Sequence, residues 1–200
     1  MKKLLLVIVL SLSLTPSLFL WAFEDVSQKR GGEETQEFSP AEQNELGVRY
    51  VIGEGVDKNF DQARRLWLRA AERGHAGAQY NLGQMYSNGT GVDSDAAIAA
   101  HWYQQAAKGG DSSAQFNLGL FYDTGTGVVE DAYKAIALYR KAALRGMPEA
   151  QNSLGRMYEM GRGIDQNIPE AKRWYRSAAL QGYVLAQSNL GFQIYAGSNS

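Results

Sequence analysis

The sequence predicts an all-α solenoid built from helix–turn–helix units, and two observations lead to this fold class. One is a spacing of 36 residues between equivalent leucines, which are Leu46, Leu82, Leu118, Leu154 and Leu190. The other is that each unit holds two stretches with apolar residues at helical spacing, separated by a Gly-x-Gly turn. Self-similarity at such a period, with no insertion or deletion, is the signature of stacked repeats.

The repeat occupies residues 40–200 and divides into four full units and one half unit. The expected ranges are about 40–75, 76–111, 112–147 and 148–183, followed by 184–200. In the second unit, the first helix (helix A) is expected from about Ala76 to Asn88, with Leu82, Gly83 and Tyr86 on one stripe. Glycine inside a helix costs ~1 kcal/mol relative to alanine. Its recurrence at one phase therefore predicts a close approach by the partner helix.

The second helix of each unit (helix B) is expected to begin directly after a capping residue. Asn59, Asp95, Asp131 and Asn167 share this column, and their side chains are good N-cap acceptors. Ala99, Tyr103 and Ala106 lie at the spacing of one buried face. Because a helix pair cannot bury its apolar face alone, the units are expected to stack and share a continuous core.

Residues 1–22 are expected to be a signal peptide or an N-terminal anchor. Lys2 and Lys3 precede an apolar run, as in secretory signals. The preferred interpretation is a signal peptide cleaved after Ala22. The alternative is an uncleaved anchor, because the apolar run is long enough to span ~30 Å of hydrocarbon. Residues 23–39 are polar and predict a flexible tether. The rest of the chain is expected to be exported, either periplasmic or secreted, or anchored in the inner membrane facing the periplasm.

Composition excludes several functional classes. The formal net charge of −1 lacks the basic excess that nucleic-acid binding needs, so no nucleic-acid partner is expected. The chain has no cysteine and only two histidines, His75 and His101, which leaves no evident metal site, cofactor site or nucleophile–base arrangement. The membrane is expected to be contacted only through residues 1–22 when they are uncleaved.

Within the units, the segments AQYNLGQMYSNGTGV and HWYQQAAKGG resemble the Sel1-like repeat, a relative of the tetratricopeptide repeat. The resemblance covers about residues 40–200 and implies a right-handed superhelix with the A helices lining a concave face. It also implies an adaptor role, as in signalling or envelope assembly, including bacterial exported members. The terminal units depart from the pattern, with Glu42 in a small-residue column, Trp67 in a tyrosine column and Ile194 where tyrosine is expected. Some exported relatives carry a disulfide in each repeat, and this cysteine-free chain does not belong to that subgroup.

The candidate binding residues lie on helix A opposite the leucine stripe, in columns that differ from unit to unit. Turning 100° per residue places these columns on the expected concave face. The candidate set is Tyr80, Gln84, Phe116, Leu120, Asp123, Arg156 and Glu159. Its apolar centre and charged flank are typical of a protein-binding groove. The alternative is that Tyr80 and Phe116 pack against neighbouring helices and complete the core.

The function expected from these observations is a non-enzymatic scaffold or adaptor of the cell envelope that binds a protein or peptide partner. The alternative is an envelope enzyme or a peptidoglycan- or carbohydrate-binding protein, which would need carboxylates converging in a pocket. Self-association is a further expectation, because the terminal helix would expose Phe192 and Tyr195.

Overall fold

The computed structural model describes residues 38–198, without the side chains of residues 194 and 196–198. Within this range the chain is entirely helical and turn, with no strand. The expected signal peptide or anchor, and the expected tether up to residue 37, lie outside the described residues. None of the described helices is long and apolar enough to cross a membrane.

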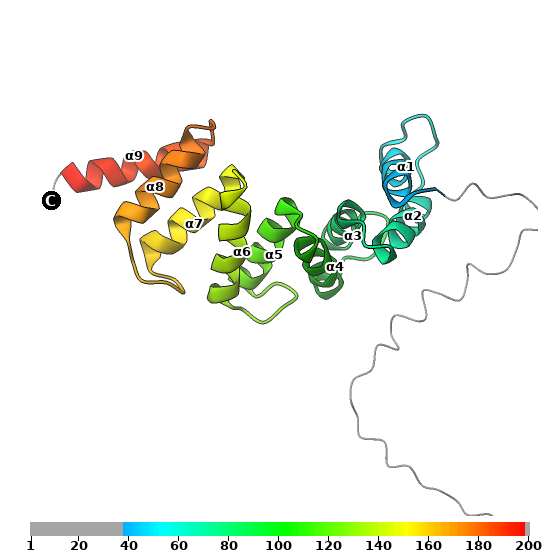
Figure 1. The fold of residues 1–200 in the computed structure, drawn as a ribbon, viewed down its shortest axis with the longest axis horizontal. Helices are drawn as coiled ribbons and strands as arrows, with labels where there is room; N and C mark the ends of the chain where they lie inside the picture. Colours follow the sequence, from blue (N-terminus) through cyan, green and yellow to red (C-terminus); the bar gives the residue numbers. More distant parts are fainter. Residues whose placement is uncertain (1–37, 199–200) are drawn as a thin grey trace, which may run out of the picture. The chain divides into compact units, whose positions relative to one another are not determined.

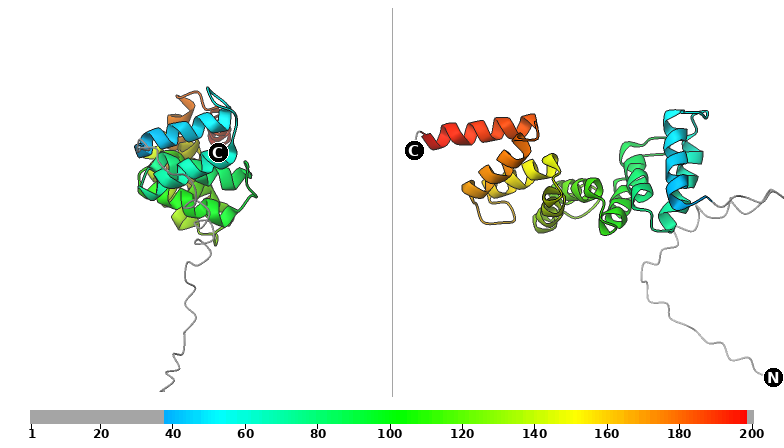
Figure 2. Two further views of the ribbon diagram at one scale, coloured as in Figure 1. Left: turned by 90° about the vertical axis from the view of Figure 1, so that its right-hand side faces the viewer. Right: turned by 45° about the horizontal axis from the view of Figure 1, so that its top comes forward.

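The described residues form a consecutive series of helical hairpins, which confirms the predicted all-α solenoid (Figures 1 and 2). The A helices are α1 (Pro40–Ile52), α3 (Ala76–Asn88), α5 (Ser112–Thr124), α7 (Pro148–Met160) and α9 (Val184–Ser198). The B helices are α2 (Phe60–Glu72), α4 (Ala96–Lys108), α6 (Ala132–Leu144) and α8 (Ile168–Ala179). Every helix packs on the helices before and after it in the chain, and α3 also touches α5.

On the A helices α1, α3, α5 and α7, a glycine receives an aromatic ring from the B helix of its own unit. A Cβ atom on Gly83 would lie 2.5 Å from the Tyr103 ring, and one on Gly155 would lie 2.7 Å from the Tyr175 ring. In the first unit Trp67 takes the same place over Gly47. Any side chain would force the two helices apart, so the predicted close approach explains why the column is glycine.

The helix boundaries follow the capping residues. Asn59, Asp95, Asp131 and Asn167 each accept a hydrogen bond from a backbone N–H in the first turn of a B helix, as expected. At the opposite end of α3, Gly89 has φ 68°, a left-handed conformation that costs glycine little. Local sequence therefore sets where the B helices start and where α3 stops.

Glutamine joins each unit to the one before it. The side chains of Gln79, Gln115, Gln151 and Gln187 donate from Nε2 to a backbone carbonyl near the end of the preceding B helix. For Gln79 the acceptor is the Ala71 carbonyl, 3.0 Å away. Each of these carbonyls also accepts a hydrogen bond from the backbone N–H of the turn glycine three residues later. The glutamine therefore supplies a second donor, and this one links two units.

The core between the helices is built from alanine, leucine and ring side chains. Ala99, Ala106, Leu82 and Leu154 are fully buried, and so is Tyr139. Small residues at the helix contacts allow the ring of each B helix to reach the glycine of its A helix. The core thus repeats from unit to unit and leaves the outer columns of the A helices to differ.

Candidate partner-binding face

The predicted binding residues come from three successive A helices. Tyr80 and Gln84 lie on α3, then Phe116, Leu120 and Asp123 on α5, with Arg156 and Glu159 on α7. We call these seven residues the A-helix face. Arg156 is exposed and the other six are half-buried, so the face is partly committed to packing and partly open.

The two aromatic rings of the A-helix face also belong to the packing between helices. The Tyr80 ring centroid lies 5.9 Å from that of Tyr103, and Phe116 lies 5.8 Å from Tyr139. Leu120 packs with Phe116 against the core cluster around Tyr139. The rings therefore pack against the B-helix tyrosines, as the alternative reading expected, and they remain half-buried.

Polar contacts order the α3 part of this face. The Gln84 amide donates from Nε2 to the Tyr80 hydroxyl, 2.7 Å away. The pKa of Tyr80 is raised by burial and by the negative charge of Asp111, so its hydroxyl stays protonated. The neutral phenol and the amide leave this end of the face uncharged.

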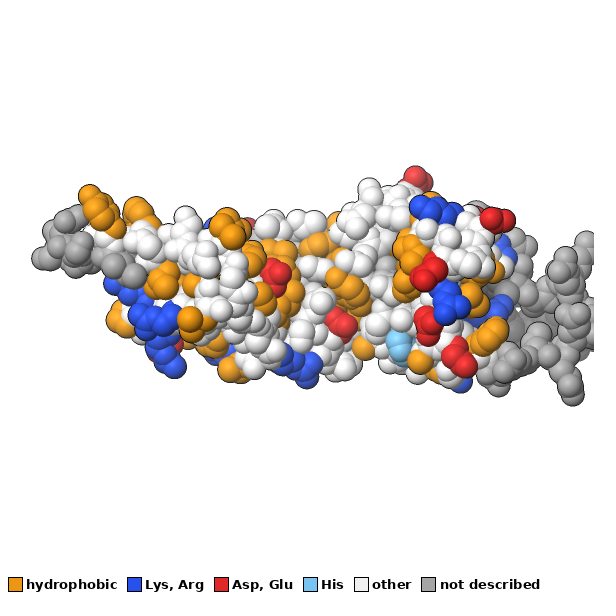
Figure 3. All heavy atoms as spheres, turned by 90° about the horizontal axis from the view of Figure 1, so that it is seen from above, with side chains coloured by type: hydrophobic (Ala, Val, Ile, Leu, Met, Phe, Trp, Pro, Cys, Tyr) orange, Lys and Arg blue, Asp and Glu red, His pale blue; other side chains and the backbone are white. Residues whose placement is uncertain are grey.

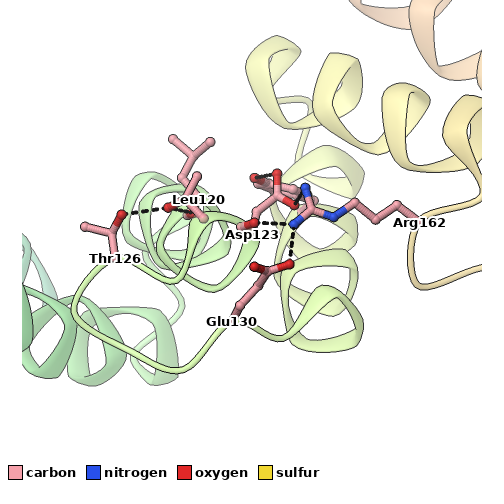
Figure 4. Close-up of polar contacts among 7 residues, drawn as sticks. Leu120, Asp123, Thr126, Glu130 and Arg162 are labelled. Carbon is pink, nitrogen blue, oxygen red and sulfur yellow. Dashed lines mark hydrogen bonds and ion pairs between the residues drawn. The ribbon is translucent and has the colours of Figure 1, made fainter.

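Asp123 is held by groups from two other elements. The Tyr139 hydroxyl of α6 donates to it over 3.3 Å, and Arg162 lies 2.9 Å away in the loop after α7. Figure 4 shows the Arg162 side chain reaching both Asp123 and Glu130, which is 2.7 Å from it. Arg162 therefore ties the fourth unit to the third and shares its positive charge between Asp123 and Glu130.

Glu159 is bound in the equivalent way one unit later. It accepts hydrogen bonds from the Tyr175 hydroxyl of α8 and from the Gln193 amide of α9. Burial, followed by the hydrogen bond to Glu159, raises the pKa of Tyr175. Both of these donors are neutral groups, whereas Asp123 is paired with an arginine.

Sequence reasoning missed the tyrosines that hold the two acids. Tyr139 and Tyr175 recur 36 residues apart, as do Asp123 and Glu159, and this paired recurrence was the available signal. It also missed two hydrogen bonds between side-chain amides of neighbouring A helices, donated by Asn81 to Asn44 and by Asn189 to Asn152. Each of these has an N–O distance of 2.9 Å.

Apolar and acidic side chains share one side of the helical series in Figure 3. Over the middle helices, red acidic groups stand among orange apolar ones. Such a surface offers hydrophobic contact together with charge selection, as protein-binding patches do.

Two depressions in the described part of the chain lie away from the A-helix face and are lined by basic side chains. One of about 620 Å³ and another of about 260 Å³ are lined from α4 to α6 by Lys108, Lys141 and their neighbours, without a carboxylate. The described residues also hold no group of three or more His, Asp or Glu that could bind a metal ion.

Stacked 36-residue hairpins, with a glycine–ring contact in each full unit, define a helical-repeat protein. The chain belongs to the Sel1 repeat family, whose model matches residues 43–75, 76–111, 112–147 and 148–183. Proteins with Sel1 repeats generally mediate protein–protein interactions, and the fold is generally a non-catalytic scaffold. No curated protein sequence matches the chain.

The solved structures that are similar to this chain include two other proteins with this fold. The protective antigen c5321 of uropathogenic Escherichia coli is 40% identical over 80% of the chain, with a TM-score of 0.77. A Sel1 repeat protein from Oxalobacter formigenes is 39% identical over 76% of the chain, with a TM-score of 0.70. The chain spans 34% of the antigen's length and 62% of the Oxalobacter protein's length.

Proposed function

We propose that this protein is a non-enzymatic adaptor of the cell envelope that binds a protein or peptide partner on the A-helix face. The observation that carries the proposal is the half-buried apolar group of Tyr80, Phe116 and Leu120 beside the charged residues Arg156 and Glu159. These columns differ between units while the glycine, leucine and ring columns stay fixed. Packing accounts for the fixed columns, and recognition of a partner would account for the variable ones.

The envelope part of the proposal rests on the N-terminal sequence. The cationic start and apolar run of residues 1–22 favour export, with the repeat domain placed in the periplasm, secreted, or facing the periplasm from the inner membrane. An exported chain without cysteine needs no disulfide to fold, because its units stabilise one another.

We favour the adaptor over an envelope enzyme or a carbohydrate-binding protein. Acid–base hydrolysis of a sugar chain needs two carboxyl groups facing one substrate. Asp123 and Glu159 are instead each bonded to a B-helix tyrosine of their own unit. Each acid is therefore engaged in the helix packing of its own unit, and the two do not form a catalytic pair.

The test uses Arg156, because it is exposed and its replacement leaves the core untouched. Tyr80 and Phe116 are poorer probes, since removal of either ring would also weaken the packing around Tyr103 or Tyr139. We expect Arg156→Glu to reduce co-purification of the crosslinked partner from native cells by about tenfold or more, as lost charge pairing at an interface does.

The matched control is Arg65→Glu, the same charge reversal at an exposed position on α2. The control should retain the partner, and circular dichroism should show both variants folded. Equal recovery of the partner with Arg156→Glu and with the unaltered chain would refute the placement of the binding face. Equal loss with both variants would point to a general charge effect and would refute it as well.

A further inference from the structure

A groove lies between the B helices of the second and third units. It consists of the depressions of about 620 Å³ and about 260 Å³, which adjoin because Ala107, Lys108 and Lys141 line both of them. We call the two together the α4–α6 groove. None of the seven residues of the A-helix face lines it. The groove is therefore a separate surface that can be tested separately.

Four cationic side chains line the groove, and no carboxylate does. All four are exposed, and they are Lys108, Lys134, Lys141 and Arg145. Lys134 forms an ion pair with Asp131 over 3.2 Å. Among the described residues, Lys108 and Lys141 have no ion-pair partner. Like charges that gather without an opposite charge favour a partner that brings negative groups.

This gathering of charge is specific to the junction between the second and third units. The columns of Lys108, Lys141 and Arg145 hold Glu72, Gln105 and Gly109 one unit earlier, and Leu144, Ser177 and Gln181 one unit later. A cation in the last turn of a helix suits the helix dipole, and every B helix has one. The dipole does not explain why cations from two helices line one groove.

The same junction is less complete than the next one along the chain. The Oε1 of Gln151 accepts a hydrogen bond from Gln181 over 2.9 Å. Arg145 stands in the column of Gln181, but it donates to the Gly110 carbonyl instead. Gln115, which is 4% exposed and lines the larger depression, is left with an Oε1 that has no hydrogen-bond partner in the described part of the chain. The side chains of the protein itself thus do not complete this junction.

Apolar side chains also line the groove. Leu118 is buried, and Tyr122 and Leu138 are half-buried beside it. Leu144, which is 72% exposed, lines the larger depression. From Lys134 to the end of the groove, the helix rise of ~1.5 Å per residue gives a length of ~16 Å, or about five residues of extended chain. Apolar contacts of this length beside cations match a short peptide that carries both apolar and acidic side chains.

We propose that the α4–α6 groove is a second binding site, which takes an extended acidic segment of a partner protein. The carboxylates of the segment pair with Lys108, Lys141 and Arg145, and its apolar side chains cover Leu138 and Leu144. Charge complementarity selects this occupant, because the groove offers cations and no acid. Inorganic phosphate would leave the apolar lining uncovered, and a flat bilayer surface would not fill a depression.

The direct test is fluorescence anisotropy with the purified full chain and a set of end-blocked pentapeptides that carry a neutral fluorophore. The set holds three glutamates and two leucines in every order. At least one order should bind saturably, and its affinity should fall as the salt concentration rises. The same peptide with glutamine in place of each glutamate should bind about tenfold more weakly or less.

Charge reversal in the protein locates the site. Lys108→Glu and Lys141→Glu should each raise the dissociation constant of the acidic peptide by about tenfold or more. The matched control is Arg69→Glu on α2, an exposed position in the column of Lys141 two units earlier, and it should change the constant by less than about twofold. Circular dichroism should show all three variants folded, because each position is exposed.

Several outcomes would overturn the proposal. They are the absence of saturable binding by every acidic peptide at low salt, equal binding of the glutamine peptide, and equal loss with Arg69→Glu and Lys141→Glu. Phosphatidylglycerol vesicles are the remaining probe. Vesicle binding that Lys141→Glu abolishes, in a chain that binds none of the peptides, would assign the groove to a membrane surface and refute the peptide site.

Discussion

Tyr139 lies directly over Gly119, so that a Cβ atom on the glycine would come within 2.8 Å of the ring. The same ring supports Phe116 on one side, and its hydroxyl reaches Asp123. One tyrosine thus sets the distance between α5 and α6 and also positions two residues of the A-helix face. Packing and the proposed recognition surface are coupled through this residue, and the predictions below separate the two.

Gly119→Ala is expected to destabilise the protein by about 1–3 kcal/mol, because the added methyl group overpacks a close helix contact. Urea unfolding followed by tryptophan fluorescence measures the change. Gly191→Ala is the matched control, since no described atom lies near the added methyl group. The control should be neutral or more stable by up to ~1 kcal/mol. Equal effects of the two substitutions would contradict the role assigned to the ring contact.

Gln79→Ala is expected to cost about 0.5–1.5 kcal/mol, because the Ala71 carbonyl would keep the Gly74 N–H donor and lose the one hydrogen bond that links it to the next unit. The exposed Gln104→Ala on α4 serves as the comparison and should change stability by less than about 0.5 kcal/mol. Hydrogen exchange should also show faster opening at the end of α2 in the Gln79 variant. An unchanged unfolding midpoint would show that the glutamine column does not join the units energetically.

Stability is expected to fall at alkaline pH because of the buried tyrosines. Burial raises the pKa of Tyr103 to about 12, above the value near 10 of an exposed tyrosine. The unfolded chain therefore loses this proton first, so the contribution of Tyr103 is complete below pH ~10 and is lost as the pH rises toward ~12. Burial together with Asp123 raises the pKa of Tyr139 in the same direction.

The check on the alkaline loss is a series of urea unfolding curves at stepped pH values for the unaltered chain and Tyr103→Phe. The variant keeps the ring over Gly83 but has no titrating hydroxyl, so its stability should decline less steeply between pH ~10 and ~12. Identical slopes for the two proteins would rule out Tyr103 as a source of the alkaline loss.

The proposed export of the chain predicts a defined mature N-terminus. Intact-mass analysis of the protein recovered from its native cells should give a form that begins at Phe23, after removal of residues 1–22. A full-length form in the membrane fraction would support the anchored alternative. Recovery of the full-length chain from the cytoplasm would contradict export in either form.

The sequence was sufficient to predict the helices because its signals are local and repeated. The predicted span Ala76–Asn88 matches α3, and the cap at Asp95 begins α4 at the next residue. The glycine column predicted the close packing of helices A and B for a similar reason. Glycine inside a helix is costly, so its recurrence required a compensating contact.

The contacts between units were harder to predict, because they depend on how one repeat is rotated against the next. Arg162 pairs with Asp123 across 39 residues, and Gln193 reaches Glu159 across 34. Helical periodicity assigns a face to each residue but does not say which neighbour it meets there. For that reason Tyr80 and Phe116 could be placed on the A-helix face while their packing on the B-helix tyrosines stayed open.

The most direct test of the A-helix face is a scan with a genetically encoded photocrosslinking amino acid in native cells. Placed at Gln84, Leu120 or Arg156, the probe should capture one discrete partner. Placed at the exposed positions Ala137 or Lys141 on α6, it should capture none or far less of the same partner. Capture that is equal on both sides, or confined to α6, would contradict the central claim that this protein recognises its partner through the A helices.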